Sequence, residues 1–180
     1  MLKHGLISNV EHWAELLSFD TVNIDYAALK RLVGKSVQVK EEIVEQDPFE
    51  RNIRKVLNLG HTVGHAFESM ALAENRPVLH GYAVAWGIVC ELYLSHTKVG
   101  FPKEKMRQTI RFIKDNYGVF TFDCKKYEQL YAFMTHDKKN TSGTINFTLL
   151  KDIGDICINQ TADKDTIFDM LDFYRECMGI

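Results

Sequence analysis

The chain has 180 residues, of which 46% are hydrophobic, and its formal net charge is −2. This length and composition can bury a sizeable core, and the balanced charge gives no reason to expect a nucleic-acid partner. The longest uncharged run, residues 77–90, is too short to cross a bilayer, and the first residues do not resemble a secretory signal. We therefore expect a cytoplasmic protein with no membrane partner. Four scattered cysteines without a Cys-x-x-Cys pair indicate reduced thiols.

Hydrophobic periodicity predicts a mainly α-helical chain. The first expected helix covers residues 2–17, and a long amphipathic helix follows over about 25–45 with Asp25 as its N-cap. Asp47-Pro48 ends that helix, and another helix is expected from about residue 51. Further helices are expected over residues 82–97, 103–116, 125–134 and 163–178.

The convincing strand signal covers residues 144–150, where Ile145, Phe147 and Leu149 alternate with polar residues. Residues 154–158 can supply an antiparallel partner. The sequence has no internal repeat, low-complexity stretch or linker. We therefore expect a single multi-helix domain over residues 1–180 with one small β-hairpin near 144–158.

The helix expected from residue 51 carries an unusual polar stripe. At a helical advance of about 100° per residue, five polar side chains fall within an arc of about 80°; they are Arg54, Asn58, His61, His65 and Glu68. A solvated face usually carries Lys and Glu, so this composition is typical of a site. Two interior glycines, Gly60 and Gly64, each cost about 1 kcal/mol against Ala, and close approach of a ligand or a neighbouring helix can offset that cost. A pair of histidines four residues apart also occurs as a hydrogen-bonded structural pair.

A third histidine, His80, opens the next apolar segment after a break at Pro77. Two helices joined by a short turn would bring His80 beside His61, and imidazoles from adjacent helices commonly hold a divalent ion. A catalytic zinc usually takes three protein ligands. By position alone, Glu68 and His65 are candidates for the missing one.

These motifs resemble those of a known family. Residues 54–68 resemble the signature of 3-dehydroquinate synthase, and Leu79-His80-Gly81 resembles the second metal-binding segment of that family. Other matching pieces follow in the family's order: Lys3-His4-Gly5-Leu6-Ile7, Lys40, Glu50 and Asp137-Lys138-Lys139. The resemblance runs nearly end to end. It implies the helical C-terminal domain of an enzyme of the sugar-phosphate cyclase superfamily.

The resemblance also implies a role for each matching residue. Metal binding, with Zn2+ or Co2+, falls to His61 and His80, and catalysis to Glu50, His65 and Lys3. Substrate binding falls to five residues: Lys40, Arg54, Asn58, Lys138 and Lys139. Glu68 then becomes a structural neighbour of the site. From the residues alone, Lys40 can equally be a solvated helix lysine, Glu50 a helix-capping carboxylate, and the loop at 138–143 a plain exposed turn.

The family's enzyme converts 3-deoxy-D-arabino-heptulosonate 7-phosphate to 3-dehydroquinate plus phosphate, a carbon-oxygen lyase reaction of the shikimate pathway that leads to chorismate and the aromatic amino acids. It uses a divalent metal and NAD, which is reduced and reoxidised within one turnover. In the family an N-terminal NAD-binding domain precedes this region, and the chain lacks its glycine-rich fingerprint. We therefore expect no cofactor-binding residue here. The resemblance places a metal-binding Glu directly before Met1, so we expect a fragment that is inactive alone and whose parent is a homodimer.

Two departures from the family pattern keep alternatives open. Tyr82 stands where the family commonly has Glu, and Trp86 stands where it has a smaller residue. A related cyclase acting on another sugar phosphate therefore remains an alternative. Two other classes remain as well: a helical metal-binding module for regulation or storage, and a structural domain without metal.

Overall fold

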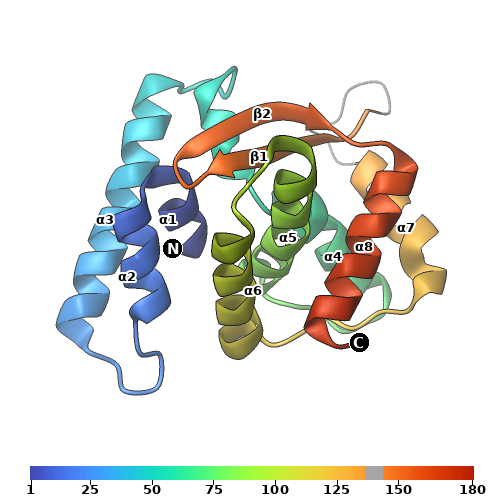
Figure 1. The fold of residues 1–180 in the computed structure, drawn as a ribbon, viewed down its shortest axis with the longest axis horizontal. Coiled ribbons are helices and arrows are strands. Elements are labelled where there is room, and N and C mark those ends of the chain that lie inside the picture. Colours follow the sequence, from blue (N-terminus) through green and yellow to red (C-terminus); the bar gives the residue numbers. More distant parts are fainter. Residues whose placement is uncertain (137–143) are drawn as a thin grey trace.

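The computed structural model describes residues 1–136 and 144–180. Two helices, α4 (His61–Ala73) and α5 (His80–Leu94), pack against each other in the middle of the fold (Figure 1). A hairpin of β1 (Asn146–Asp152) and β2 (Asp155–Thr161) crosses one end of the molecule. The mainly α class with one small β-hairpin is confirmed.

The remaining helices surround this pair. On one side lie α1 (Leu2–Ser8), α2 (Val10–Ser18) and α3 (Tyr26–Gln46), and on the other α7 (Tyr127–Thr135) and α8 (Lys164–Met178), as Figure 1 shows. α6 (Lys103–Tyr117) packs against α5. Three short helical segments complete the described part: the 3₁₀-helices η1 (Ile53–Asn58) and η3 (Cys124–Lys126), and the π-helix η2 (Ser95–Val99). No helix in the described ranges is both long and apolar enough to cross a membrane.

The expectation of a single first helix is wrong, because Asn9 separates α1 from α2. Its backbone is extended, with φ −158° and ψ 163°, and its side-chain oxygen accepts the backbone N–H of His12 at 2.8 Å. Asparagine is a favoured N-cap because it satisfies an N–H that the helix leaves open. The two helices therefore meet at a corner.

The expectation of one helix from residue 51 is also wrong. Residues 53–58 form η1, and α4 begins only at His61 after Gly60, whose φ of 79° lies in the left-handed region. The Gly60 N–H donates to the buried carboxylate of Glu91 at 2.7 Å. A left-handed residue stops a helix, so Arg54 and Asn58 do not share a helix with the histidines.

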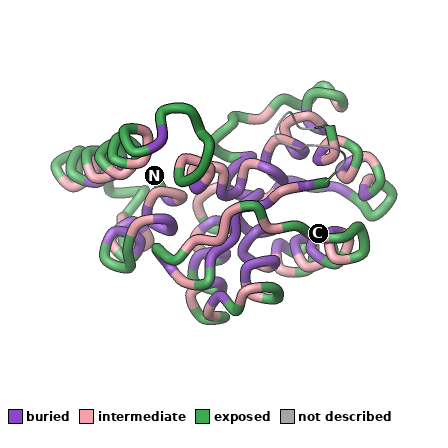
Figure 2. The backbone as a smooth tube through the Cα atoms, turned by 90° about the horizontal axis from the view of Figure 1, so that it is seen from above, coloured by how far each residue is buried: buried purple, intermediate pink, exposed green. Residues whose placement is uncertain are grey.

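The other elements follow the sequence pattern more closely. Asp25 caps α3 by accepting the N–H groups of Ala27 and Ala28, and Asp163 caps α8. In the hairpin, Leu149 pairs with Cys157, and the Gly154 N–H donates to the Leu6 carbonyl at 3.0 Å. The hairpin is therefore tied to α1. Figure 2 shows the buried segments gathered in the centre of the molecule and the exposed ones along its rim.

Candidate active site

One cavity of about 320 Å³ brings the expected site residues together. Its walls include eight of them: Lys3, Lys40, Glu50, Arg54, Asn58, His61, His65 and His80. They come from α1, α3, the turn after α3, η1, α4 and α5. Convergence of charged and imidazole groups from six segments is typical of a ligand site. Lys138 and Lys139 lie outside the described residues.

Three histidines form a triangle in this cavity. The ring centroids of His61 and His65 are 5.5 Å apart, those of His61 and His80 5.3 Å, and those of His65 and His80 5.8 Å. His61 and His65 lie one turn apart on α4, and His80 is the first residue of α5. The sequence-based expectation that His80 would lie beside His61 is therefore confirmed.

Hydrogen bonds orient two of these rings. The Nδ1 of His61 lies 3.1 Å from the Leu59 carbonyl oxygen, and the Nδ1 of His80 lies 3.0 Å from Oε2 of Glu68. Both acceptors favour the tautomer with the proton on Nδ1, so the lone pair lies on Nε2. A metal-ligating histidine usually has such an acceptor on its other nitrogen.

Glu68 has a position that allows two roles. It bonds to His80, which agrees with its interpretation as a neighbour of the site. However, its carboxylate and the ring nitrogens of His65 and His80 also offer ligand atoms that all lie within 4.8 Å of one another. Glu68 is therefore either an orienting partner of His80 or a ligand in its own right.

Glycines bring α4 and α5 close enough to form the triangle. Gly60 lies beside Ile88 and Gly64 beside Val84, so the helices run antiparallel with backbones in contact. A Cβ added at Gly87 would overlap the Gly60 carbonyl oxygen and lie 2.7 Å from the Gly64 nitrogen. Gly60 and Gly64 thus allow α5 to approach α4 closely. Approach of a neighbouring helix was one of the two explanations that we expected for these glycines; the other was approach of a ligand.

The turn between α3 and η1 presents Glu50 and Arg54. Glu50 has a left-handed backbone with φ 55°, and its carboxylate accepts a hydrogen bond from Asn58 Nδ2 at 3.0 Å. Arg54 Nη1 donates to the Pro48 carbonyl at 2.7 Å. The alternative that Glu50 caps a helix is wrong for this structure, because Asp47 accepts the N–H groups of the turn.

Two lysines bring positive charge to the cavity. Lys3 on α1 donates from Nζ to the Leu57 carbonyl at 2.6 Å, which links α1 to η1. Lys40 lies on the exposed surface of α3 and lines the cavity. Together with Arg54 they surround the cavity with cationic groups, which suits an acidic substrate.

His4, which is not among the residues expected from the sequence, also lines the cavity. Its Nδ1 is buried without a hydrogen-bond partner among the described residues. Burial lowers the pKa of His4 to about 4, with further lowering by the positive charges of the chain's amino group, Lys3 and Lys40. The ring is neutral at pH 7. Its position directly after Lys3 was the available signal.

A second cavity of about 550 Å³ adjoins the first and shares Glu50 and Asn58 with it. Strand residues Asn146, Thr148 and Asn159 line its other side. Lys55 Nζ donates to Asn159 Oδ1 at 3.2 Å across it. The hairpin therefore borders the candidate site.

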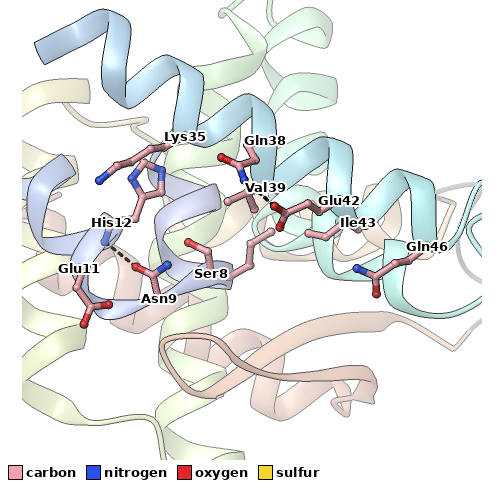
Figure 3. A pocket seen from close by; sticks show the side chains of 11 residues that line it. Ser8, Asn9, Glu11, His12, Lys35, Gln38, Val39, Glu42, Ile43 and Gln46 are labelled. Carbon is pink, nitrogen blue, oxygen red and sulfur yellow. Dashed lines mark hydrogen bonds between the residues drawn. The ribbon is translucent and has the colours of Figure 1, made fainter. Parts of the chain in front are cut away.

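A groove of about 590 Å³ between the α1–α2 corner and α3 holds none of the expected residues (Figure 3). Lys35 at its rim is paired with Glu15 at 2.7 Å, and His12 Nε2 lies 3.1 Å from Ser36 Oγ. Glu42 accepts a hydrogen bond from Gln38 at 2.9 Å, so both Lys35 and Glu42 are engaged with the protein itself. We therefore place the site in the histidine cavity.

Aromatic residues fill the space behind His80. The Tyr82 ring lies 5.9 Å from Trp86 and 5.5 Å from Tyr117, and Trp86 Nε1 donates to the Gly118 carbonyl at 3.0 Å. Trp86 is buried, whereas Tyr82 is partly exposed. Tyr82 and Trp86, the two departures from the family pattern, thus belong to one packed aromatic cluster between α5 and α6.

Comparison with protein families identifies the chain. Residues 1–140 match the family described as 3-dehydroquinate synthase C-terminal. The chain belongs to this family. A 3-dehydroquinate synthase from Parabacteroides distasonis is 57% identical over 180 residues, which cover 100% of this chain and 51% of the relative. One from Leptospira interrogans is 41% identical over 166 residues, covering 88% of this chain and 45% of the relative. The chain spans about half the length of these relatives.

Solved structures share the fold of this 3-dehydroquinate synthase C-terminal chain. A 2-epi-5-epi-valiolone synthase from Streptomyces hygroscopicus, with NAD+ and Zn2+ bound, matches with a TM-score of 0.79 at 18% identity, covering 97% of this chain and 49% of that one. A 2-deoxy-scyllo-inosose synthase complexed with carbaglucose-6-phosphate, NAD+ and Co2+ matches with a TM-score of 0.75 at 19% identity, again covering 97% and 49%.

Proposed function

We propose that this chain is the metal- and substrate-binding part of a 3-dehydroquinate synthase, which converts 3-deoxy-D-arabino-heptulosonate 7-phosphate to 3-dehydroquinate and phosphate. The observation that carries the proposal is the convergence of eight expected residues on one cavity. Membership of the family supports it. The NAD site would lie in the part of the protein that the relatives have and this chain does not match.

The donor set fits a divalent metal. In the proposal His61 and His80 bind it through Nε2, because Nδ1 of each ring has an oxygen acceptor. Nitrogen and carboxylate donors suit zinc or cobalt. The resemblance puts a third ligand, Glu, directly before Met1, and Met1 lines a cavity of about 250 Å³ together with His61 and His80.

Each of the two cofactors would supply one kind of chemistry. A bound metal would polarise the substrate hydroxyl and lower its pKa. NAD would take up the hydride and return it within the same turnover. The residues of this chain would bind and orient the substrate and move its protons.

Substrate binding would fall to the cationic groups. Arg54 can hold the substrate carboxylate with a planar pair of N–H donors while Nη1 keeps its bond to Pro48. Lys40 and Lys3 would add positive charge from α3 and α1. Asn58 would hydrogen-bond to the ring or the phosphate. Lys138 or Lys139, which lie outside the described residues, would supply a further phosphate contact. By holding the substrate in one orientation, these contacts would favour the reaction.

Proton transfer would fall to His65 and Glu50. The His65 imidazole lines the cavity one helical turn from His61, and imidazole is the side chain that most often acts as a general acid or base. The Glu50 carboxylate, held by Asn58, is the second candidate for general acid or base work. Phosphate loss can be assisted by the substrate's own phosphate, which would leave these residues mainly to position the groups.

The test joins this chain to the part of the Parabacteroides distasonis relative that it does not match. We expect metal-dependent phosphate release from the seven-carbon substrate, with loss of at least 100-fold in His61→Ala. His96→Ala should retain activity, because His96 bonds to Phe101 outside the cavity. Phosphate release from a six-carbon sugar phosphate instead would indicate a related cyclase. A joined protein that folds, binds zinc and releases no phosphate from either substrate would refute the proposal.

A further inference from the structure

Asp47 organises the turn that carries Glu50 and Arg54. One carboxylate oxygen accepts the backbone N–H of Arg51 at 3.0 Å, and the other accepts those of Asn52 at 2.7 Å and Arg54 at 3.1 Å. Asp47 is buried and is not among the residues that line the histidine cavity. Its carboxylate is therefore engaged with the backbone of the turn.

This turn requires such support. Glu50 has φ 55°, a left-handed conformation that a non-glycine residue rarely adopts. Residues in sparsely populated backbone conformations persist when the surrounding structure holds them there. The three bonds to Asp47 begin at the very next residue, Arg51, so they fix the chain just after Glu50.

Asp47 and Pro48 together hold the backbone and the side chain of Arg54. Its backbone N–H donates to Asp47 at 3.1 Å, and its side-chain Nη1 donates to the carbonyl of Pro48 at 2.7 Å. The start of η1 and the direction of the guanidinium thus depend on residues 47 and 48. Glu50 is also linked to η1 through Asn58.

We infer that Asp47 is a positioning residue for the active site, whose carboxylate sets the places of Glu50 and Arg54 without touching the substrate. The inference rests on the proposed function. The hydrogen bond from the Arg51 backbone lowers the pKa of Asp47, although burial opposes this, and those from Asn52 and Arg54 add to it. The group is therefore a carboxylate at neutral pH, able to accept all three bonds.

The first test compares Asp47→Asn with Asp25→Asn in the joined protein described above. Asparagine keeps the size but places an NH2 group against backbone donors. Asp25 is a matched control, because it accepts two N–H groups at the other end of α3 at 2.9 and 3.1 Å. We expect kcat/KM to fall at least 10-fold in Asp47→Asn, with a higher KM from the displaced Arg54, and to stay within twofold in Asp25→Asn.

A double-mutant cycle separates positioning from general loss of stability. If Asp47 acts through Glu50 and Arg54, then Asp47→Asn should reduce kcat/KM much less in a Glu50→Gln, Arg54→Gln background than in the unchanged protein. If the substitutions acted independently, their fold-reductions in kcat/KM would multiply. Full multiplication, or a wild-type kcat/KM in Asp47→Asn, would overturn the inference.

Hydrogen exchange gives a readout that does not depend on activity. In Asp47→Asn the amides of Arg51, Asn52 and Arg54 should exchange at least 10-fold faster, while those of α5 keep their wild-type rates. Unchanged exchange at these three amides would overturn the inference even if activity fell. If the unchanged protein released no phosphate, the proposed function would fail while the exchange result still reported on the role of Asp47 in the turn.

Discussion

Several side chains around the cavity are held by specific hydrogen-bond partners, such as Lys3 by Leu57 and Arg54 by Pro48. His4 borders the site as a half-buried, neutral imidazole whose buried Nδ1 has no hydrogen-bond partner within the described residues. Its position directly after Lys3 was the signal that the sequence offered, and His4 was not among the expected site residues. The packing of α1 against α2 and α3, which places it there, becomes visible only in the fold.

His4 makes stability depend on pH. The unfolded chain binds a proton at the ordinary histidine pKa of 6.5, whereas the folded chain binds it only near 4. As pH falls through this window the unfolded state gains the proton first, so the free energy of unfolding decreases from pH 6.5 to 4. Urea unfolding at pH 7 and pH 5 should show a smaller decrease in His4→Gln than in the wild type.

The exposed His136 provides the control for this measurement. His136→Gln should keep the wild-type pH dependence. An equal decrease in His4→Gln and the wild type would show that His4 does not titrate as its burial indicates.

Glu68 should orient His80, and its removal should weaken metal binding. Glu68→Gln keeps an acceptor but loses the charge beside Nδ1, and loss of such a partner typically costs about 10-fold or more in affinity. Zinc titration measures the change, with the exposed Glu104→Gln on α6 as the control. The visible spectrum of the Co2+ form should keep its band positions in Glu68→Gln. Shifted bands would instead make Glu68 a ligand.

Helices and turns place these side chains, and their ends were predicted where a local signal exists. Asp25 and Asp163 mark helix starts because a side-chain oxygen satisfies N–H groups a few residues away. Gly60 gave no comparable signal, since its conformation depends on a hydrogen bond to Glu91, 31 residues later in the chain. The polar stripe therefore named residues that do line one cavity, but it placed them on a single helix, which is wrong. Arg54 and Asn58 reach the cavity from η1 rather than from α4.

The α4–α5 contact should not tolerate a side chain at Gly87. A Cβ there would overlap the Gly60 carbonyl, and overpacking of this kind costs about 1–3 kcal/mol. Gly87→Ala should therefore lower the free energy of unfolding in denaturant titration. Gly34→Ala on α3 is the control, because nothing lies within 4 Å of its Cβ. That change should be neutral or stabilising by up to about 1 kcal/mol. Equal effects of the two changes would contradict the role given to the contact.

At the scale of the whole molecule, the described residues form a hydrophobic core, and the candidate site lies where segments from α1, α3, η1, α4 and α5 meet. The class, the hairpin and most helices could be predicted from periodicity, whereas the convergence of α1, α3 and η1 on the histidines could not. That convergence depends on long-range bonds such as those of Lys3 to Leu57 and Gly154 to Leu6. The roles of the site residues came from the resemblance rather than from the pattern.

We expect this chain alone to bind metal but not to catalyse the reaction. Alone, it should bind zinc through the histidines and release no phosphate from the seven-carbon substrate. Joined to the unmatched part of the Parabacteroides distasonis relative, it should bind zinc more tightly and release phosphate. Isothermal titration and a phosphate assay measure the two properties. Turnover by the chain alone would contradict the proposed division.

The contact among Gly60, Gly64 and Gly87 restricts how this protein can change over evolutionary time. A larger residue in a core is often accommodated when a neighbour becomes smaller, but these three residues have no side chain to lose. Relief after any substitution there must come from moving α4 away from α5. The same movement would separate His61 from His80, whose ring centroids are 5.3 Å apart. A larger residue at any of these glycines therefore cannot be compensated by a second substitution among them. It would instead alter the histidine triangle.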